Sequence, residues 1–360
     1  MTLAIRDGVP LAPFTTLELG GPARHFAEAG DDATLVEALR WAEARQLPVL
    51  VLGGGSNLVI ADGGFPGLAV RVGARGLAFA EGSGEVRVTA AAGEPWDDLV
   101  AATVARGLAG VECLSGIPGL AGATPIQNVG AYGQEVAETI RAVRVVERGT
   151  WQVRELAPDA CGFAYRDSAF KRDPDRFVVL GVTFGLRRDG APTLRYGELA
   201  GAIADLGGGD GSPTLADTRR AVLSLRRRKS MLITGGDPNR RSVGSFFTNP
   251  MVSAGEADAV AARAVALGVV GAPHEMPRWP APDGRVKLAA GWLIERAGVV
   301  KGLRRGAVGV SSAHALALVH HGGGTTDGLL ALAREVRNAV RDRLGVTLTP
   351  EPTLIGMAWI

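Results

Sequence analysis

The sequence has little cysteine, few aromatic residues and no long apolar run. Its two cysteines, Cys113 and Cys161, are too few for a disulfide framework and lack CxxC spacing. This cysteine usage is typical of a reducing compartment. No apolar run approaches the ~20 residues that cross a bilayer, and the first residues lack the basic head and apolar stretch of a signal peptide. We therefore expect a soluble cytoplasmic protein without membrane partners.

Charge of one sign is also lacking. The chain has 39 basic and 37 acidic residues, a net charge of +2, which argues against a general nucleic-acid-binding protein. Its strongest basic feature is the short run Arg226–Lys229. The five histidines show no spacing typical of metal sites. We expect neither a nucleic-acid partner nor a bound metal.

Glycine is abundant instead. The sequence has 51 glycines in 360 residues, about twice the average usage. They form short clusters between apolar runs, which indicates tight turns or close approaches of the backbone to a ligand.

Hydrophobic periodicity and turn residues predict a mixed α+β protein. A chain of 360 residues is long enough for two or three domains. The pattern of residues along the sequence changes near residue 230, which suggests a domain boundary there. The predicted helices are 32–46, 95–106, 214–228, 255–267, 287–297 and 326–344. The predicted strands are 48–52, 57–60, 68–72, 85–91, 140–147 and 177–186, with a strand-like end around Glu351.

The stretch "LVLGGGSNLVI" places three glycines, Gly53–Gly55, between two predicted strands. A Rossmann or P-loop turn has other spacing and opens a helix, so neither fits. Three successive glycines let backbone N–H groups converge on an anion, and Ser56 and Asn57 could add donors. The alternative is a plain β-turn.

A second glycine-rich stretch, "CLSGIPGLAGATPIQNVGAYG" (residues 113–133), has Ser115, Thr124, Gln127 and Asn128 interleaved with its glycines. Such a segment could surround a flat cofactor with backbone contacts, or it could brace a core. Together the two stretches suggest one extended dinucleotide held from two sides.

These two stretches resemble the FAD-binding domain of the vanillyl-alcohol-oxidase type. Within that group the chain is similar to the UDP-N-acetylenolpyruvoylglucosamine reductase (UDP-N-acetylmuramate dehydrogenase) family. The similarity continues in order through "FAYRDSAFK", "RYGEL", "RRRK", "GSFFTNP", "KLAAGWLIERAG" and "PEPTLIG". "RYGEL" points to the class with an additional tyrosine loop.

The resemblance implies a two-lobed FAD-binding domain followed by an α+β substrate-binding domain. Its lobes would be 1–75 and 76–230, its substrate domain 231–345, and the final strand region 346–360 would pack back near the active site. FAD would be held noncovalently, and the UDP-sugar would close against it from the C-terminal domain. The implied cofactor-binding residues are Gly53, Gly54, Gly55, Ser56, Asn57, Leu58, Ser115, Gly116, Ile117, Pro118, Gly119, Gly122, Thr124, Gln127 and Gly130.

The implied activity is NADPH-dependent reduction of UDP-N-acetylglucosamine enolpyruvate to UDP-N-acetylmuramate in peptidoglycan precursor synthesis, and hence a part in cell wall biogenesis, cell shape and cell division. Hydride would pass from flavin N5 to the enolpyruvyl β-carbon. Ser245 would protonate the α-carbon, and Arg166 and Glu351 would stabilise the enolate. The alternatives are a turn serine, an Arg166–Asp167 surface ion pair and a solvated glutamate.

Further residues match the family's substrate contacts. They are Tyr132, Tyr165, Tyr196, Arg226, Lys229, Asn249 and Arg296. Arg226 and Lys229 suit a diphosphate, although cations at a helix end also stabilise the helix by themselves. Arg296 stands where many members of the family have glutamine, so its role is open. We expect a monomer.

Two other functions fit the same residues. One is an oxidase of the same FAD fold that acts on an alcohol or sugar, which would not need the acids Ser245 and Glu351. The other is an inactive protein that senses a nucleotide sugar, in which replacing Ser245 would change nothing measurable.

Overall fold

The computed structural model describes residues 3–82, 84–206 and 212–359. The first two residues of the expected lobe 1–75 and the last residue of the region 346–360 lie outside these ranges. The chain divides into two compact units. Unit 1 comprises 1–9, 22–55 and 65–232, and unit 2 comprises 10–21, 56–64 and 233–360. Two short early segments therefore belong to the same unit as the C-terminal part of the chain.

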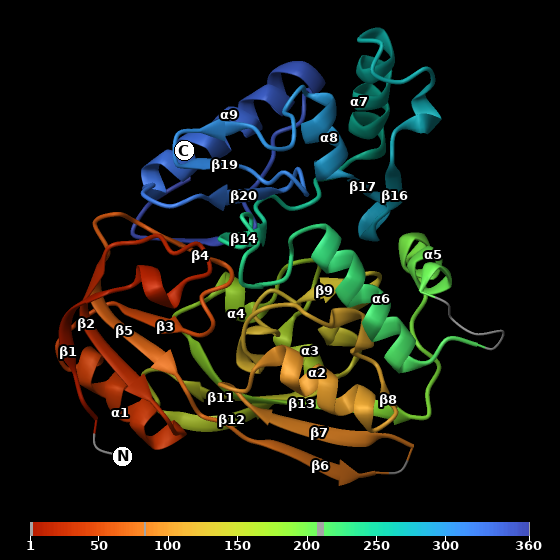
Figure 1. The fold of residues 1–360 in the computed structure, drawn as a ribbon. Helices are drawn as coiled ribbons and strands as arrows, with labels where there is room; N and C mark the ends of the chain where they lie inside the picture. Colours follow the sequence, from red (N-terminus) through yellow and green to blue (C-terminus); the bar gives the residue numbers. More distant parts are fainter. Residues whose placement is uncertain (1–2, 83, 207–211, 360) are drawn as a thin grey trace. The chain divides into compact units, whose positions relative to one another are not determined.

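Helices and strands are mixed throughout the described residues (Figure 1). The α-helices are α1 Asp32–Glu43, α2 Trp96–Ala105, α3 Pro158–Cys161, α4 Ala169–Arg172, α5 Gly197–Asp205, α6 Leu215–Arg228, α7 Ala254–Ala266, α8 Ala290–Arg296 and α9 Thr326–Leu344. Short 3-10 turns are η1 Ala12–Phe14, η2 Glu112–Leu114, η3 Ala121–Ala123, η4 Val136–Glu138, η5 Pro273–Glu275 and η6 Pro282–Gly284.

The strands form several small and medium sheets. In unit 1 they are β1 Arg6–Pro10, β2 Pro22–Ala29, β3 Val49–Leu52, β5 Phe65–Val72, β6 Leu77–Glu81, β7 Val86–Ala91, β8 Leu108–Ala109, β9 Gly130–Ala131, β10 Gln134–Glu135, β11 Ile140–Glu147, β12 Gln152–Leu156 and β13 Phe177–Arg188. In unit 2 they are β4 Leu58–Ile60, β14 Ser242–Ser245, β15 Met251–Val252, β16 Arg278–Pro280, β17 Val286–Leu288, β18 Arg304–Arg305, β19 Val308–Val310, β20 Ala317–His320 and β21 Thr353–Ile355.

Unit 1 contains a four-stranded sheet in the order β1-β2-β5-β3. Its pairs β2–β5 and β3–β5 are parallel. Helix α1 packs against β2 and β5. It does so because Leu35, Ala38, Leu39 and Ala42 recur at helical spacing and are buried. Asp31 begins this helix by accepting a hydrogen bond from the Thr34 N–H at 2.7 Å.

The second sheet of unit 1 is antiparallel, in the order β12-β11-β13-β7-β6, with β8 also paired to β13. Residues 178–182 of the central strand β13 are all buried, which explains the continuous apolar run in this part of the sequence. Trp96 of α2 packs on Phe184 of β13, with 5.6 Å between ring centroids. This sheet and its core support the second glycine-rich stretch.

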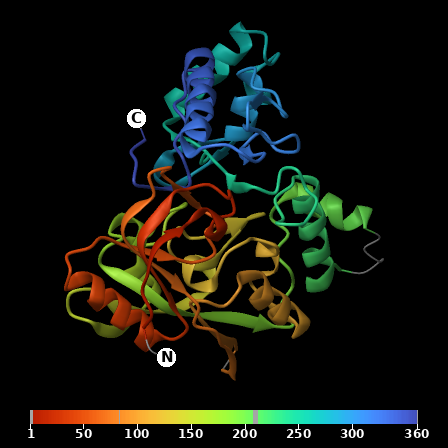
Figure 2. The ribbon, with the colours of Figure 1, turned by 60° about the vertical axis from the view of Figure 1, so that its left-hand side comes forward.

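Unit 2 contains the sheet β14-β20-β19-β18, a three-stranded sheet β15-β17-β16 and the parallel pair β21–β4. Helix α9 contacts β19, β20, α7 and α8, and Figure 2 shows it in blue beside α7. Its N-terminus is capped twice, because Thr325 accepts from the Gly328 N–H and Asp62 accepts from the N–H groups of Thr326 and Asp327. The segment 56–64 thus anchors the last helix.

Most predicted elements are confirmed within a few residues. The strand 140–147 and the helix 326–344 agree in both bounds. The predicted helix 287–297 is wrong at its start, because Lys287 and Leu288 belong to β17 and α8 begins at Ala290. Pairing of β17 with both β15 and β16 outweighs the helical pattern there. Pro95 is the residue before α2 and not part of its first turn.

Candidate functional site

The two glycine-rich stretches meet within unit 1. Gly53–Gly55 follow β3, and Gly55 has a left-handed φ of +62°. A Cβ atom on Gly54 would lie 2.8 Å from the Cα of Gly119, which is closer than side-chain carbons normally come. A Cβ atom on Gly53 would lie 3.6 Å from Cδ1 of Leu120. Gly54 and Gly119 can approach this closely because residue 54 has no side chain, and the arrangement suits one ligand held by both stretches.

Several expected cofactor-binding residues also have a visible structural role. Ser115 and Thr124 are buried, and their hydroxyl groups donate to the carbonyls of Glu112 and Ala121 at 2.7 and 2.8 Å. A Cβ on Gly122 would lie 2.5 Å from the Cβ of Ala92. These residues shape and pack the second stretch, and the hydroxyl oxygens keep lone pairs that could accept a hydrogen bond.

Gly116 is held at both its backbone N–H and its carbonyl group. Its N–H donates to Asp97 Oδ1 at 2.6 Å, and its carbonyl accepts from Arg226 Nε at 3.2 Å. Asp97 in turn binds Arg219 through two hydrogen bonds of 2.6 and 2.8 Å. Burial alone raises the pKa of Asp97, but its hydrogen bonds with Arg219 and Gly116 outweigh burial and hold the pKa below its ordinary value. Sequence reasoning missed Asp97 and Arg219, since no local pattern connects residues this far apart.

Four expected substrate contacts gather around α5 and α6 in unit 1. The rings of Tyr132 and Tyr196 meet edge to face, with 5.7 Å between centroids. Lys229 Nζ lies 5.9 Å from the centroid of the Tyr132 ring and 2.6 Å from Glu198 Oε2. Burial raises the pKa of Tyr132 to about 12, so its phenol remains a hydrogen-bond donor at neutral pH.

Arg226 completes this cluster. It donates to the Met231 carbonyl at 2.8 Å as well as to Gly116, and burial lowers the pKa of its guanidinium. A guanidinium keeps its charge even when buried. The cluster therefore combines two cations, Arg226 and Lys229, with two phenol rings, a set that suits a nucleoside diphosphate.

Arg166 has a left-handed backbone, with φ at +54°. Its guanidinium donates to the carbonyls of Asn128 and Gly130 at 3.3 and 2.5 Å and lies 5.1 Å from the centroid of the Tyr165 ring. The carboxylate of Asp167 pairs with Arg172. These contacts direct Arg166 toward the end of the second glycine-rich stretch.

Unit 2 brings together Ser245, Glu351 and Asn57. Ser245 ends β14 opposite Ala317 of β20. The next carbonyl, that of Phe246, accepts from the Glu351 N–H at 2.9 Å, and Phe246 is fully buried. Asn57 Nδ2 donates to the Glu351 carbonyl at 3.4 Å. The backbones of the expected proton donor and the expected glutamate are therefore joined through one buried residue.

The other expected residues of unit 2 lie around α8. Asn249 Oδ1 accepts from the Ala290 N–H at 2.9 Å and so caps this helix. Arg296 is the exposed last residue of α8, and its guanidinium lies 5.9 Å from the ring centroid of Trp292. The remaining expected cofactor residues lie on the same segments as those above: Leu58 begins β4, and Ile117, Pro118, Gln127 and Gly130 belong to the second glycine-rich stretch.

Within residues 3–82, 84–206 and 212–359, no group of His, Cys, Asp and Glu is arranged to hold a metal ion. In the same ranges no helix is long and apolar enough to cross a membrane. Both cysteines are buried and free, and burial raises the pKa of Cys113 to about 12 and that of Cys161 to about 11.

Two family models match the chain. Residues 23–154 match an FAD binding domain, and residues 237–355 match the UDP-N-acetylenolpyruvoylglucosamine reductase C-terminal domain. The expected fold class, an FAD-binding domain with an α+β C-terminal domain, is thereby confirmed.

Relatives cover nearly the whole chain. It is 49% identical to the UDP-N-acetylenolpyruvoylglucosamine reductase of Thermobifida fusca over 99% of both chains. It is 50% identical to the same-named protein of Saccharopolyspora erythraea over 98% of this chain and 96% of the relative. The fold matches the crystal structure of UDP-N-acetylenolpyruvylglucosamine reductase from Thermus caldophilus, with a TM-score of 0.65 at 24% identity over 99% of both chains. The chain belongs to the UDP-N-acetylenolpyruvoylglucosamine reductase family.

Proposed function

We propose that this protein reduces UDP-N-acetylglucosamine enolpyruvate to UDP-N-acetylmuramate, with NADPH as reductant and noncovalently held FAD as carrier. The observation that carries the proposal is the 49% identity, over 99% of the chain, to a protein named for this reaction. The approach of Gly54 to Gly119 supports it, because an elongated dinucleotide needs two segments that reach it together. The reaction would place the protein in peptidoglycan precursor synthesis. We also propose that it acts in the cytoplasm and as a monomer.

Different residues of the chain would bind the cofactor and the substrate. When bound, FAD takes two electrons from NADPH and makes them available to the enolpyruvyl β-carbon. Gly53–Gly55 would present N–H groups to its pyrophosphate, and Ser56 and Asn57 would add polar side chains. Tyr132, Tyr196, Arg226 and Lys229 would bind the UDP part of the substrate, where two phosphates accept hydrogen bonds from cations and phenols.

The acid–base chemistry would belong to three side chains. Arg166 suits the enolpyruvyl carboxylate, since a guanidinium can offer it two parallel hydrogen bonds and charge. Negative charge grows on this carboxylate as the β-carbon is reduced. Arg166 would stabilise the enolate by its positive charge, and Glu351 would do so by donating a hydrogen bond from its carboxyl group. Ser245 would hold the proton that the α-carbon then takes, because a carbanion-like carbon is basic enough for a well-placed hydroxyl.

The experiment is a flavin titration. Purified protein, reconstituted with FAD where needed, should be yellow; NADPH should bleach it, and UDP-N-acetylglucosamine enolpyruvate should restore the colour. A protein that binds no FAD contradicts the proposal. Rapid bleaching by a sugar alcohol but not by NADPH would indicate an oxidase, and UDP-sugar binding without turnover would indicate a sensor.

A further inference from the structure

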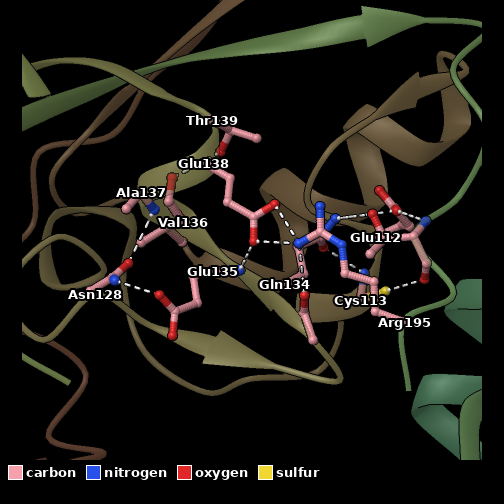
Figure 3. Close-up of polar contacts among 12 residues, drawn as sticks. Glu112, Cys113, Asn128, Gln134, Glu135, Val136, Ala137, Glu138, Thr139 and Arg195 are labelled. Atoms are coloured by element: carbon pink, nitrogen blue, oxygen red, sulfur yellow. Dashed lines mark hydrogen bonds and ion pairs between the residues drawn. The ribbon is translucent and has the colours of Figure 1, made fainter. Parts of the chain in front are cut away.

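A buried polar network in unit 1 includes Glu112, Cys113 and Gln134, whose contacts are drawn in Figure 3. At its centre are Glu112 and Gln134, which are 0% and 2% exposed. The Glu112 carboxylate accepts from the Gly110 N–H at 2.7 Å, the Thr193 N–H at 2.8 Å and Gln134 Nε2 at 3.2 Å. A buried carboxylate with three N–H donors is well satisfied, and removal of any donor is costly.

Gln134 uses both ends of its amide in the same network. Its Oε1 accepts from the Cys113 N–H at 2.9 Å, and its Nε2 donates to Thr193 Oγ1 at 3.1 Å as well as to Glu112. The Cys113 thiol donates to the Thr193 carbonyl at 3.1 Å. Thr193 is therefore held at its N–H, its hydroxyl and its carbonyl, all by groups from the η2 turn and from β10.

These contacts join the segments that carry the two tyrosines. Tyr132 forms the turn of the β9–β10 hairpin with Gly133, and both residues have positive φ, at +50° and +81°. Such a turn is the two-residue type that fixes hairpin register. Gln134 follows directly, and Thr193 lies three residues before Tyr196. Arg195 adds an outer contact, to the Gly133 carbonyl at 3.2 Å and to Glu138 at 3.0 Å.

We propose that Gln134, through Glu112 and Thr193, is a positioning residue that keeps Tyr132 and Tyr196 in the arrangement that binds a uridine diphosphate sugar. This inference rests on the proposed function. Gln134 acts through the tyrosines and does not itself touch the substrate. Its amide can do this because it alone in the network offers one acceptor and two donors at once.

The test is the near-isosteric change Gln134→Glu, which replaces the donating NH2 by a titratable oxygen beside Glu112. Below its pKa the introduced carboxyl group can donate one hydrogen bond to Glu112. Above this pKa the carboxylates at positions 112 and 134 repel each other. The repulsion raises the pKa of the introduced carboxyl group and weakens the hold on the segment that carries Thr193 and Tyr196. The other titratable or charged groups facing the network are Glu138, Arg195 and Cys113, whose thiol has a pKa of about 12 and stays protonated in the assay.

The measured quantity is KM for UDP-N-acetylglucosamine enolpyruvate between pH 6 and pH 9, as a ratio of variant to wild type. We expect this ratio to rise roughly tenfold across the range. The limiting rate of flavin reduction at saturating NADPH should stay within about twofold of wild type, because the residues that the Gln134 side chain contacts, Glu112, Cys113 and Thr193, are not among those expected to bind FAD. Gln152→Glu, the same change at an exposed glutamine of β12, is the matched control and should give a flat ratio.

Thr193→Val is the second variant, since it deletes only the hydroxyl that Gln134 contacts and keeps the side-chain shape. We expect KM to rise about threefold with the limiting rate of flavin reduction unchanged. This variant tests the proposal if Gln134→Glu does not fold, or if its ratio of KM to wild type does not change with pH. In either case an unchanged KM in Thr193→Val overturns the proposal. Wild-type protein that neither binds FAD nor oxidises NADPH would instead refute the proposed function.

Discussion

The clamp formed by Asp97 and Arg219 offers a quantitative test of how the second glycine-rich stretch is held. The perturbation is Asp97→Asn, which keeps size and shape but removes the negative charge. Asp97 Oδ1 accepts from both Gly116 N–H and Arg219, and Oδ2 accepts from Arg219 at 2.8 Å. An amide has only one acceptor oxygen, so at least one hydrogen bond to Arg219 is lost and the guanidinium loses its counter-charge.

The size of the expected loss of stability follows from how exposed the side chains of Asp97 and Arg219 are. A hydrogen bond to a charged group is worth about 1.5–3 kcal/mol when well buried. The Asp97 side chain is 38% exposed and that of Arg219 18%, which places the loss at the lower end. We expect Asp97→Asn to lower the free energy of unfolding of unit 1 by about 2 kcal/mol. It should also weaken FAD retention, because Gly116 belongs to the stretch expected to hold the cofactor.

The matched control is Asp98→Asn. Asp98 is the next residue, lies in the same first turn of α2 and is exposed. Both aspartates interact favourably with the N-terminus of the helix, so the control subtracts that contribution. We expect Asp98→Asn to change the free energy of unfolding by less than about 0.5 kcal/mol.

The same clamp predicts a pH dependence. The folded pKa of Asp97 lies below its ordinary value, which is about 3.9 in an unfolded chain. A depressed pKa contributes stability above the unfolded value, and that stability is lost as pH falls through the folded pKa. The difference in the free energy of unfolding between wild type and Asp97→Asn should therefore be constant from about pH 5 to pH 7 and should shrink below about pH 4.

The assay is urea unfolding followed by tryptophan fluorescence at several pH values, together with flavin absorbance after dialysis. Equal stability and equal flavin retention in Asp97→Asn and Asp98→Asn at pH 7 would refute the reasoning. If the free energies of unfolding of wild type and Asp97→Asn differ as much at pH 3 as at pH 7, the role assigned to the Asp97 charge is refuted. That result would not contradict the hydrogen bonds of Asp97.

Three further predictions concern the proposed chemistry. Ser245→Ala should keep flavin reduction by NADPH but slow substrate reduction by at least about 10²-fold, as stopped-flow absorbance would show; equal loss in both half-reactions would contradict its role. Arg166→Lys should lower kcat/KM by about 10²-fold with FAD still bound, because a lysine at this position cannot offer a carboxylate two parallel hydrogen bonds while it also contacts the carbonyls of Asn128 and Gly130; wild-type kinetics would speak against this. Gly54→Ala should reduce FAD affinity, measured by flavin fluorescence, since its Cβ would lie 2.8 Å from Gly119 Cα, whereas Gly63→Ala, which meets nothing within 4 Å, should not.

Local features of the sequence anticipated many of the secondary-structure elements. The periodic leucines and valines of α9 and the β-branched residues of β11 favour a helix and a strand through short-range backbone preference, so the bounds of both elements could be predicted closely. The prediction was wrong at Lys287, where a strand forms in place of a helix. There the partners on β15 and β16 decide the conformation, and they are distant in sequence.

The order of motifs along the chain was enough by itself to indicate the family, its FAD-binding fold and the residues expected to do chemistry, because each motif is local and read in sequence. Only the tertiary structure brought Gly54 against Gly119, joined Asp97 to Arg219 and linked Gln134 to Glu112 and Thr193. It also assigned the segments 10–21 and 56–64 to the unit formed by the C-terminal part of the chain. Such contacts join residues that are distant in sequence, so they depend on the order in which the chain connects its strands and helices in space. No short-range pattern of side chains encodes that order.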